Sequence, residues 1–540
     1  MRTLIVGGGA AGASCAARLR RLDENMEIII LEKTNEISIA NCGLPYYVSG
    51  VIAERENILV SSPAKFNKWF NIDVRLNCEV VSINRNEKFV TTNSGENISY
   101  DKLVLTPGAS PIIPPFEGMD NDKVFTVRNL FDADKIKNYI SNNNCKNAVV
   151  IGAGFIGLEM AENLLEMGLN TTLIEMAPQV LSPVDEEVAA IAQNELRKNG
   201  LNLILSDGVK SFYNQKIILN SDREVDFDIV IMAIGVRPEI NLAKSCNLEV
   251  NHGICVNEHM QTSDSNIYAA GDSVEVKDFT TGDNTLIPLA GPANRQGRII
   301  ADNICSIKST YKSSQGTSVI KIFNLTVATV GNNEKQLKSK GINYLKTFIY
   351  GKSHAGYYPG STPTLFKLLF TNEGRILGAQ AVGQEGVEKR IDVISTIMRL
   401  NGSVQDMIDS ELCYAPPYSS AKDPVNLLGM NADNILRNYV KPAFYNDLKD
   451  AFLIDVRPAM AYKNKTIDGA INIPITEIRS RISEIPRNKK VILFCFTGYT
   501  SYNASRILLQ LGFDNIYSLM GGIEFYEQQS HNKDKQEVWR

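Results

Sequence analysis

The sequence predicts a mixed α/β protein with two nucleotide-binding domains of the Rossmann type. An apolar strand, a glycine-rich turn and a helix follow one another at the N-terminus, and the same succession returns from Ala148. The chain has 540 residues, enough for roughly three to four domains of about 150 residues each. We therefore expect further domains beside the two that bind nucleotides.

The first glycine-rich turn lies between the strand 4–6 and a helix expected over 13–22. Its glycines have the G-x-G-x-x-G spacing, and a second strand over 27–31 ends in an acidic residue. This context gives the glycines a function: they let backbone N–H groups approach a pyrophosphate, while the acid binds a ribose hydroxyl. The expected contacts are Gly7, Gly9, Ala10, Ala11, Gly12, Glu32 and Lys33.

The second turn follows the strand 148–151 and opens a helix expected to end at about Met167. The next strand ends in Glu175, which accepts hydrogen bonds from a 2′-hydroxyl and repels a 2′-phosphate. Met176 follows where an arginine would favour a phosphate. We therefore expect NADH here rather than NADPH. The expected contacts are Gly152, Gly154, Ile156, Gly157, Glu159, Glu175 and Gly235.

Composition excludes several other classes of function. The net charge is -4 and the sequence pI about 5.8, which argues against nucleic-acid binding. No run of about 18 apolar residues suggests a membrane span. The N-terminus resembles no export signal, and none of the nine cysteines forms a C-x-x-C pair, so we expect a reducing cytoplasmic location. Four scattered histidines predict no metal site.

Two further motifs indicate which dinucleotide occupies the first turn. Residues 105–109 and 262–272 resemble accessory motifs of flavoproteins that bind two dinucleotides. The resemblance implies FAD at the first turn, with Thr106, Gly108 and Asp272 as further contacts. One fingerprint inserted inside the other resembles the pyridine nucleotide–disulfide oxidoreductase family over residues 1 to about 435. That family passes a hydride from a nicotinamide to FAD and then electrons to a redox group.

Cys42 is the candidate redox group. Pro45 fits the first turn of a helix, so the thiol lies near a helix N-terminus, where we expect a lowered pKa. A buried structural cysteine is the alternative. The next cysteine is Cys78, so the C-x4-C disulfide of other family members is missing. A lone thiol serves this family either as a mixed disulfide with coenzyme A or as a sulfenic acid.

The surroundings of Cys42, residues 38–46, resemble the coenzyme A-disulfide reductase group, although Ile39 replaces its usual aromatic residue. Two stretches, 354–360 and 413–419, resemble tyrosine motifs of that group. The resemblance implies a homodimer in which Tyr358 and Tyr418 reach the partner's thiol and protonate departing sulfur. Tyr357 is an alternative to Tyr358, and aromatic packing is an alternative to both roles. Coenzyme A contacts are expected from Arg18, Ser38 and Asn41.

The C-terminal segment resembles a rhodanese domain. A strand over 491–494 delivers Cys495 to a loop followed by a helix to about Leu511. Loop N–H groups and the helix N-terminus stabilise a thiolate or a persulfide there. A purely structural cysteine is the alternative. Thr500 stands where such loops usually have arginine, which disfavours thiosulfate and favours a persulfide or polysulfide donor.

The expected domains are an FAD domain (1–112 and 246–315), an NAD(P)H domain (113–245), an α+β dimerisation domain (316–435), a linker (436–448) and an α/β rhodanese domain (449–540). The expected function is NADH-dependent reduction of coenzyme A persulfide, polysulfide or coenzyme A disulfide. Two alternatives stay open: an NADH oxidase or peroxidase that cycles through a sulfenic acid, and a sulfur-carrying or sensing flavoprotein without reductase turnover.

Overall fold

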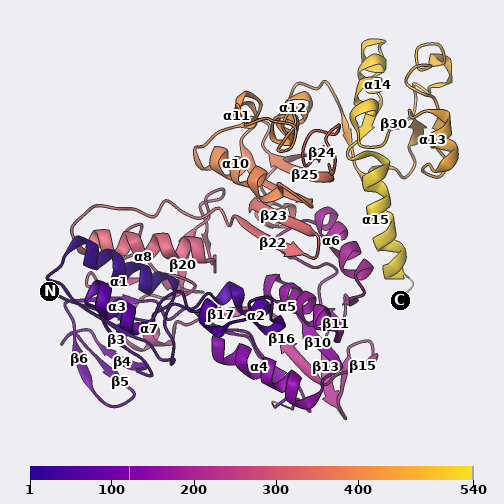
Figure 1. The fold of residues 1–540 in the computed structure, drawn as a ribbon. Coiled ribbons are helices and arrows are strands. Elements are labelled where there is room, and N and C mark those ends of the chain that lie inside the picture. Colours follow the sequence, from indigo (N-terminus) through magenta and orange to yellow (C-terminus); the bar gives the residue numbers. More distant parts are fainter. Residues whose placement is uncertain (121, 538–540) are drawn as a thin grey trace. The chain divides into compact units, whose positions relative to one another are not determined.

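The computed structural model describes residues 1–120 and 122–537, which form two compact units. Unit 1 comprises residues 1–176 and 206–316, and unit 2 comprises residues 177–205 and 317–540. The elements of both are labelled in Figure 1. Among the described residues, no helix combines the length and hydropathy needed to cross a bilayer.

The first parallel sheet of unit 1 has the strand order β19-β7-β1-β2-β3. Its strands are β1 (Arg2–Val6), β2 (Glu27–Leu31), β3 (Asp73–Arg75), β7 (Lys102–Leu105) and β19 (Ile267–Ala269). Parallel strands buried on both faces favour continuous apolar runs, and Leu4, Ile5, Ile30 and Val104 are fully buried. Helices α1 (Ala10–Leu22) and α8 (Ala290–Ile304) pack against each other beside this sheet (Figure 1).

A second parallel sheet carries the second fingerprint. Within unit 1 it contains β11 (Asn170–Glu175), β10 (Asn147–Ile151), β16 (Ile229–Met232) and β9 (Val124–Phe125) in that order. Helix α5 (Phe155–Glu166) follows β10, and α4 (Leu130–Asn143) precedes it. The starts and ends of α1 and α5 confirm the expected helices to within three residues.

Unit 1 also contains smaller antiparallel sheets. Strands β4 (Val80–Asn84), β5 (Phe89–Thr92) and β6 (Asn97–Ser99) form one small sheet, and β13 (Val209–Tyr213), β14 (Lys216–Leu219) and β15 (Glu224–Asp226) form another. Strands β8 (Ala109–Pro111) and β17 (Val236–Pro238) pair antiparallel, with Ser110 opposite Arg237. The segments that follow β7 and β16 are therefore paired with each other.

An antiparallel sheet in the order β22-β23-β26-β25-β24 forms the centre of unit 2. Its strands are β22 (Ser318–Ile322), β23 (Leu325–Gly331), β24 (Leu345–Lys352), β25 (Pro363–Phe370) and β26 (Ile376–Gly383). The helices of this region are α6 (Glu186–Lys198), α9 (Glu334–Ser339), α10 (Val387–Arg399), α11 (Val404–Asp409) and α12 (Pro424–Leu436). Helix α10 packs on β23 and β26, and α12 packs on β24.

The C-terminal module has a parallel sheet in the order β27-β31-β30-β28-β29. The strands are β27 (Pro442–Ala443), β28 (Phe452–Asp455), β29 (Ile471–Asn472), β30 (Val491–Phe494) and β31 (Ile516–Leu519), with helices α13 (Ala459–Asn464), α14 (Tyr499–Gln510) and α15 (Gly522–Glu537). Strand β27 lies inside the segment 436–448 and pairs with β31, so part of the expected linker belongs to this sheet.

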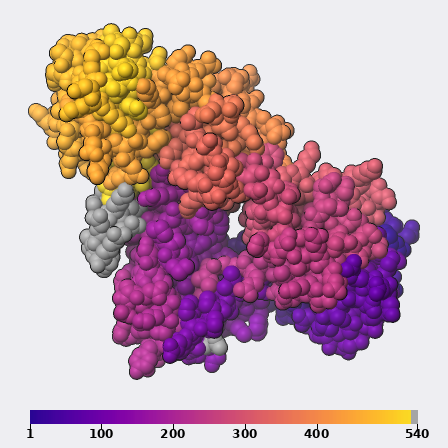
Figure 2. Space-filling view, turned by 180° about the vertical axis from the view of Figure 1, so that it is seen from behind, coloured from indigo at the N-terminus to yellow at the C-terminus, as the bar shows by residue number. Residues whose placement is uncertain are grey.

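Aromatic rings hold the C-terminal module against the antiparallel sheet. Phe348 of β24 is buried and stacks on Phe525 of α15, with ring centroids 5.2 Å apart. Phe444 approaches the same ring from the segment after β27, at 5.8 Å. Helix α15 also runs beside α6, where the Asn194 amide donates to the Gln528 side chain at 2.8 Å (Figure 1). In Figure 2 the orange and yellow surfaces of unit 2 form one continuous body.

Candidate functional site

The first glycine-rich turn has no room for side chains where the chain crosses itself. Gly7 has φ +98°, and a Cβ there would overlap the carbonyl of Thr106, while one at Gly12 would overlap the carbonyl of Gly7. Thr106 fixes the crossing, because its hydroxyl donates to the carbonyls of Val6 and Gly7 at 2.9 Å. A Cβ at Gly9 would meet nothing within 4 Å. This open side of the turn fits the pyrophosphate of a dinucleotide.

The acid at the end of β2 is held against the turn. One oxygen of Glu32 accepts a hydrogen bond from the Gly8 N–H at 2.7 Å, and the other accepts from the N–H and hydroxyl of Thr34 at 2.9 Å. Lys33 is exposed and Ala11 is buried beneath the turn. The Glu32 carboxylate therefore lies beside the position expected for the ribose. Its hydrogen bonds with backbone N–H groups fix its orientation.

The second turn repeats this geometry. Gly152 has φ +101°, a Cβ at Gly157 would overlap the Gly152 carbonyl, and Gly154 is open. Glu175 accepts a hydrogen bond from the Ala153 N–H at 2.8 Å, as Glu32 does from Gly8. Ile156 is exposed beside the turn, and Gly235 has φ +122° at the end of the neighbouring strand. The residues present therefore fit two dinucleotides.

Cys42 lies in a short 3-10 turn, Asn41–Gly43, that runs directly into helix α2 (Leu44–Ser49) with Pro45 in its first turn. Asn41 and Cys42 are exposed. Helix α2 packs on α5, and the Ser49 hydroxyl donates to Asn163 Oδ1 at 2.5 Å. The Cys42 thiol and the second glycine-rich turn thus lie at two helices that are in direct contact.

The electrostatics of Cys42 differ from the expectation. Partial burial of the thiol raises its pKa, and the charges of Glu159 and Asp272 raise it further, while a backbone hydrogen bond opposes them. The prediction of a lowered pKa is therefore wrong. The helix is only six residues long. Its dipole therefore lowers the pKa of the thiol by less than burial and the two carboxylate charges raise it.

Glu159, on helix α5, is a titratable group whose charge acts on the Cys42 thiol. Burial raises the pKa of its carboxyl to about 7, the charge of Glu162 adds to this, and a hydrogen bond with Tyr46 opposes it. Burial and the same two glutamates raise the pKa of Tyr46 to about 12. Tyr46 stands four residues after Cys42, and both groups interact with Glu159 of α5. Tyr46 was not among the predicted site residues, although this spacing could have indicated it.

Glu159→Gln should lower the pKa of the Cys42 thiol. An ionised Glu159 disfavours a second negative charge nearby, so its removal favours the thiolate, and we expect a shift of roughly one pH unit. The measurement is the pH profile of Cys42 alkylation by iodoacetamide, followed by peptide mass spectrometry.

Glu166→Gln is the matched control, because Glu166 is an exposed glutamate on the same helix. It should leave the profile unchanged. An unchanged profile in Glu159→Gln would show that its carboxylate does not act on the thiol.

The remaining contacts expected near this site have partners of their own. Arg18 forms an ion pair with Asp302 of α8 at 2.8 Å, so its charge is already balanced within the chain. Asp272 lies 3.5 Å from Arg128. Ser38 has φ +57°, and its N–H donates to the Gly8 carbonyl at 3.0 Å. Gly108 has φ +75°, with the Arg128 side chain against it.

The tyrosines lie on two neighbouring loops of unit 2. Tyr358 is 43% exposed and Tyr418 is 79% exposed. Tyr358 packs edge-on against His354, whereas the Tyr357 hydroxyl bonds the Tyr414 hydroxyl at 2.7 Å. Of the two candidates on the first loop, Tyr357 is therefore engaged with the second loop of its own chain.

Cys495 ends β30 beneath a loop that turns into α14. Its thiol is buried; the Gly498 N–H donates to Sγ at 3.2 Å and the Ser501 hydroxyl lies 3.7 Å away. Gly498 has φ +106°, the backbone conformation that directs this N–H inwards. Phe496 and Tyr499 are exposed on the loop. The arrangement can hold a sulfur anion and presents aromatic side chains around it.

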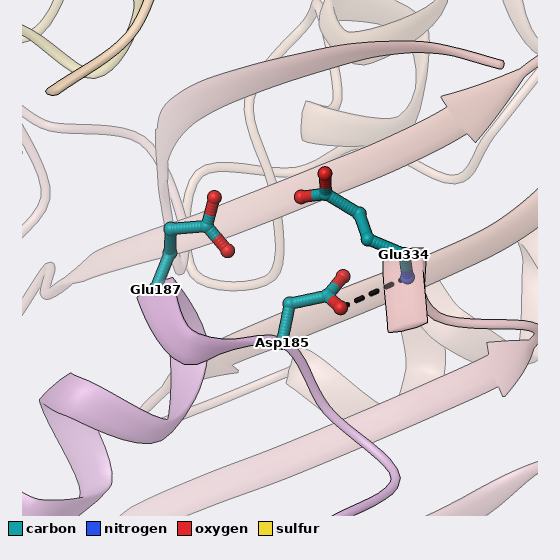
Figure 3. Close-up of side chains that lie close together, drawn as sticks. All are labelled: Asp185, Glu187 and Glu334. Atoms are coloured by element: carbon teal, nitrogen blue, oxygen red, sulfur yellow. Dashed lines mark hydrogen bonds between the residues drawn. The ribbon is translucent and has the colours of Figure 1, made fainter. Parts of the chain in front are cut away.

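Three carboxylates, of Asp185, Glu187 and Glu334, gather in unit 2 within 4.8 Å of one another (Figure 3). The dashed line in Figure 3 is the bond from the Glu334 N–H to Asp185. The ammonium of Lys367 lies 2.8 Å from Asp185 and Glu187 and also contacts Glu334. Lys346 lies 2.9 Å from Glu334. Lysine charges thus stand where a metal ion would otherwise balance the acids.

Comparison with known proteins adds three domain matches. Residues 1–297 match the pyridine nucleotide-disulphide oxidoreductase family, residues 317–424 match the dimerisation domain of that family, and residues 442–529 match the rhodanese-like domain.

Named relatives and solved structures agree with these matches. An NADH oxidase of Methanocaldococcus jannaschii is 37% identical over 81% of this chain and all of its own length. A coenzyme A disulfide reductase of Staphylococcus haemolyticus is 36% identical over 80% of this chain and all of its own. The reduced CoADR-RHD of Bacillus anthracis is 46% identical, with a TM-score of 0.96 over 98% of both chains. A NAD-dependent persulfide reductase from A. fulgidus is 36% identical, with a TM-score of 0.92 over 97% of this chain and all of its own.

Proposed function

Because the chain belongs to the pyridine nucleotide-disulphide oxidoreductase family and is an FAD-dependent oxidoreductase, we propose that it uses NADH to reduce coenzyme A persulfide through Cys42. Polysulfide and coenzyme A disulfide are further oxidants of the same class. The observation that carries the proposal is the presence of two cysteines of different chemistry in one chain: exposed Cys42 beside the nucleotide turns and buried Cys495 in a sulfur-binding loop.

The sulfur step balances with Cys42 as nucleophile. Its thiolate attacks the coenzyme A-bound sulfur of the persulfide, hydrosulfide leaves, and a Cys42–coenzyme A disulfide forms. The first turn would hold FAD and the second turn would hold NADH. Together these groups would supply two electrons and one proton, which convert the Cys42–coenzyme A disulfide back into the Cys42 thiolate and free coenzyme A. Tyr46 keeps its proton near this thiolate at neutral pH, and Glu159, whose pKa is about 7, exchanges its proton there.

The tyrosine loops complete the site in a homodimer with shared active sites. Tyr358 and Tyr418 are exposed and carried on loops of the dimerisation segment, where they can reach a second copy. There they stabilise or protonate the departing sulfur. Coenzyme A is held by Ser38 and Asn41, with Arg18 contributing when its pair with Asp302 opens.

The C-terminal module handles sulfane sulfur as a Cys495 persulfide. Its loop, residues 495–501, contains no arginine or lysine, and Arg457 beside it is paired with Asp455 at 2.7 Å. A dianionic donor such as thiosulfate therefore finds no cation within the loop, which favours a persulfide or polysulfide donor. Phe496 and Tyr499 offer an apolar approach to Cys495.

Anaerobic NADH oxidation with coenzyme A persulfide, with released sulfide measured in parallel, tests the proposal. We expect one sulfide for each NADH. Slow turnover with this substrate and fast turnover with oxygen or peroxide would instead show an oxidase or peroxidase, the activity in the name of the Methanocaldococcus jannaschii relative. Persulfide labelling of Cys495 without steady-state NADH consumption would show a sulfur carrier or sensor.

Glu175 should make NADH the preferred reductant. Its carboxylate repels a 2′-phosphate, and a charge-assisted hydrogen bond to a 2′-hydroxyl is worth about 1.5 to 3 kcal/mol. We expect kcat/KM for NADH to exceed that for NADPH by about tenfold or more. Glu175→Ala combined with Met176→Arg should reverse the order. A higher kcat/KM with NADPH in the unaltered protein would contradict this assignment.

A further inference from the structure

The two tyrosine loops of unit 2 are tied together at their bases. The Ala355 N–H of the first loop donates to the Pro416 carbonyl of the second at 3.2 Å, and the Tyr357 and Tyr414 hydroxyls bond at the exposed rim. Beneath these contacts the side chains of Ser353, His354, Ser419 and Asp423 are buried. A buried polar group needs a partner, so the bases of the loops must be organised by a hydrogen-bond network.

One side chain, Arg390 in the first turn of α10, joins the segments of that network. Its Nη2 donates to the Ser353 carbonyl at 2.8 Å, where the first loop begins, and lies 3.4 Å from the Ser419 hydroxyl, where the second ends. Nη1 donates to the Gly386 carbonyl at 3.0 Å. Nε lies 3.1 Å from Asp423 at the start of α12. The planar fork of a guanidinium serves these divergent acceptors in a way that an ammonium cannot.

Asp423 completes the network and balances its charge. It accepts from the Ser419 hydroxyl at 2.5 Å and from the Val425 N–H at 2.9 Å, so it also caps α12. The Arg390 and Asp423 side chains are only 7% and 9% exposed. Breaking a buried pair leaves an uncompensated charge, which makes the geometry of both loops depend on this contact.

The connection continues from Arg390 to Tyr358. Ser353, whose carbonyl Arg390 holds, contacts His354 Nδ1 through its hydroxyl at 3.1 Å. The other ring nitrogen lies 3.1 Å from the Pro359 carbonyl, and the ring faces Tyr358 edge-on at 5.6 Å. On the second loop, Ser419 adjoins Tyr418 directly. One residue, Ser419, therefore links the guanidinium to Tyr418, and two residues, Ser353 and His354, link it to Tyr358.

We propose that Arg390 is a positioning residue that sets Tyr358 and Tyr418 for their action on departing sulfur. The inference rests on the proposed function of the two tyrosines. Arg390 itself is buried and does not touch substrate. Its contribution is to hold two separate loops in one geometry, and a small displacement of a reacting group is enough to slow catalysis strongly.

A double-mutant cycle tests the inference, with Arg390→Lys measured alone and in a Tyr358→Phe, Tyr418→Phe background. We expect Arg390→Lys to lower kcat with coenzyme A persulfide about tenfold, to leave KM for NADH unchanged, and to leave the NADH–ferricyanide rate unchanged, since that reaction needs no tyrosine. In the double-phenylalanine background it should cost nothing further. Lys389→Gln, an exposed neighbour on α10, is the control.

The outcomes separate the inference from the function on which it rests. If the tyrosine substitutions lower kcat but Arg390→Lys does not, only the positioning role of Arg390 would be overturned. An equal loss from Arg390→Lys in both backgrounds, or an equal fall in the ferricyanide rate, would also overturn it. Tyrosine variants with full activity would overturn the proposed role of the tyrosines, and the inference with it. Ser419→Ala, which removes one member of the network without a charge, should show the same coupling at smaller size.

Discussion

Cys42→Ser should abolish NADH-driven persulfide and disulfide reduction, with a fall in kcat of at least about a thousandfold. A hydroxyl cannot form the mixed disulfide through which electrons reach the substrate, and its pKa leaves no useful anion at neutral pH. Cys42 is not part of either glycine-rich turn, so its substitution leaves both turns intact. The variant should therefore keep its flavin absorbance and its NADH–ferricyanide activity while sulfide release stops.

Cys145→Ser is the control for this loss, because Cys145 is a partly buried cysteine between α4 and β10, away from both glycine-rich turns. It should retain full activity. Turnover of Cys42→Ser at the rate of the unaltered enzyme would exclude Cys42 as the redox group. Loss of flavin from Cys42→Ser would mean instead that the cysteine is needed for the fold of the 38–50 segment.

Lys367→Met should destabilise unit 2 by about 3 to 5 kcal/mol, the cost of leaving buried charges without their partner. Lys367 is fully buried among Asp185, Glu187 and Glu334. Burial opposes ionisation of Glu187 and Glu334, yet Lys367 and Lys346 lower the pKa of Glu334 to about 2 and also lower that of Glu187. Differential scanning calorimetry of the variant should show a lower melting temperature for the transition of unit 2.

The pH dependence distinguishes this effect from simple loss of packing. In the unaltered protein the lowered pKa of Glu334 contributes stability that is present above about pH 4.5 and is lost as the pH falls toward 2. Without Lys367 the acids favour their protonated forms, so the deficit of the variant should shrink as the pH is lowered from 7 to 5.

Lys338→Met is the matched control, because Lys338 also lies near Glu334, at 3.7 Å, but is 68% exposed. Exposed pairs contribute about 0 to 1 kcal/mol. Equal melting temperatures for Lys367→Met and Lys338→Met would contradict the charge argument, and Glu334→Gln added to Lys367→Met should recover part of the loss.

Local sequence was sufficient to predict the nucleotide turns. Each fingerprint is complete within about 30 residues, and the steric reason for Gly7, Gly12 and Gly157 is a contact between neighbouring elements. The structure contains these close approaches, while nucleotide binding at the turns stays a prediction. The matched family and the α/β fold with its rhodanese module were predicted correctly.

The missed features depend on contacts between residues distant in sequence. The lowered pKa expected for Cys42 was wrong because the fold partly buries the thiol and adds the charges of Glu159 and Asp272, which follow it by more than 100 residues. In the sequence, Lys367 resembles any other strand residue. Only the fold, which brings β25 beside Asp185 and Glu334, shows that it pairs with these acids. Arg390 likewise gains its role only when two loops meet at its guanidinium. The spacing of residues along the sequence does not indicate which distant side chains come into contact.

The aromatic contacts between β24 and the C-terminal module affect where this chain can be truncated. Phe348 is covered on two sides by Phe444 and Phe525, which both come from residues after 435. A chain cut at the end of α12 would therefore leave a bare apolar face on β24, and such faces promote aggregation.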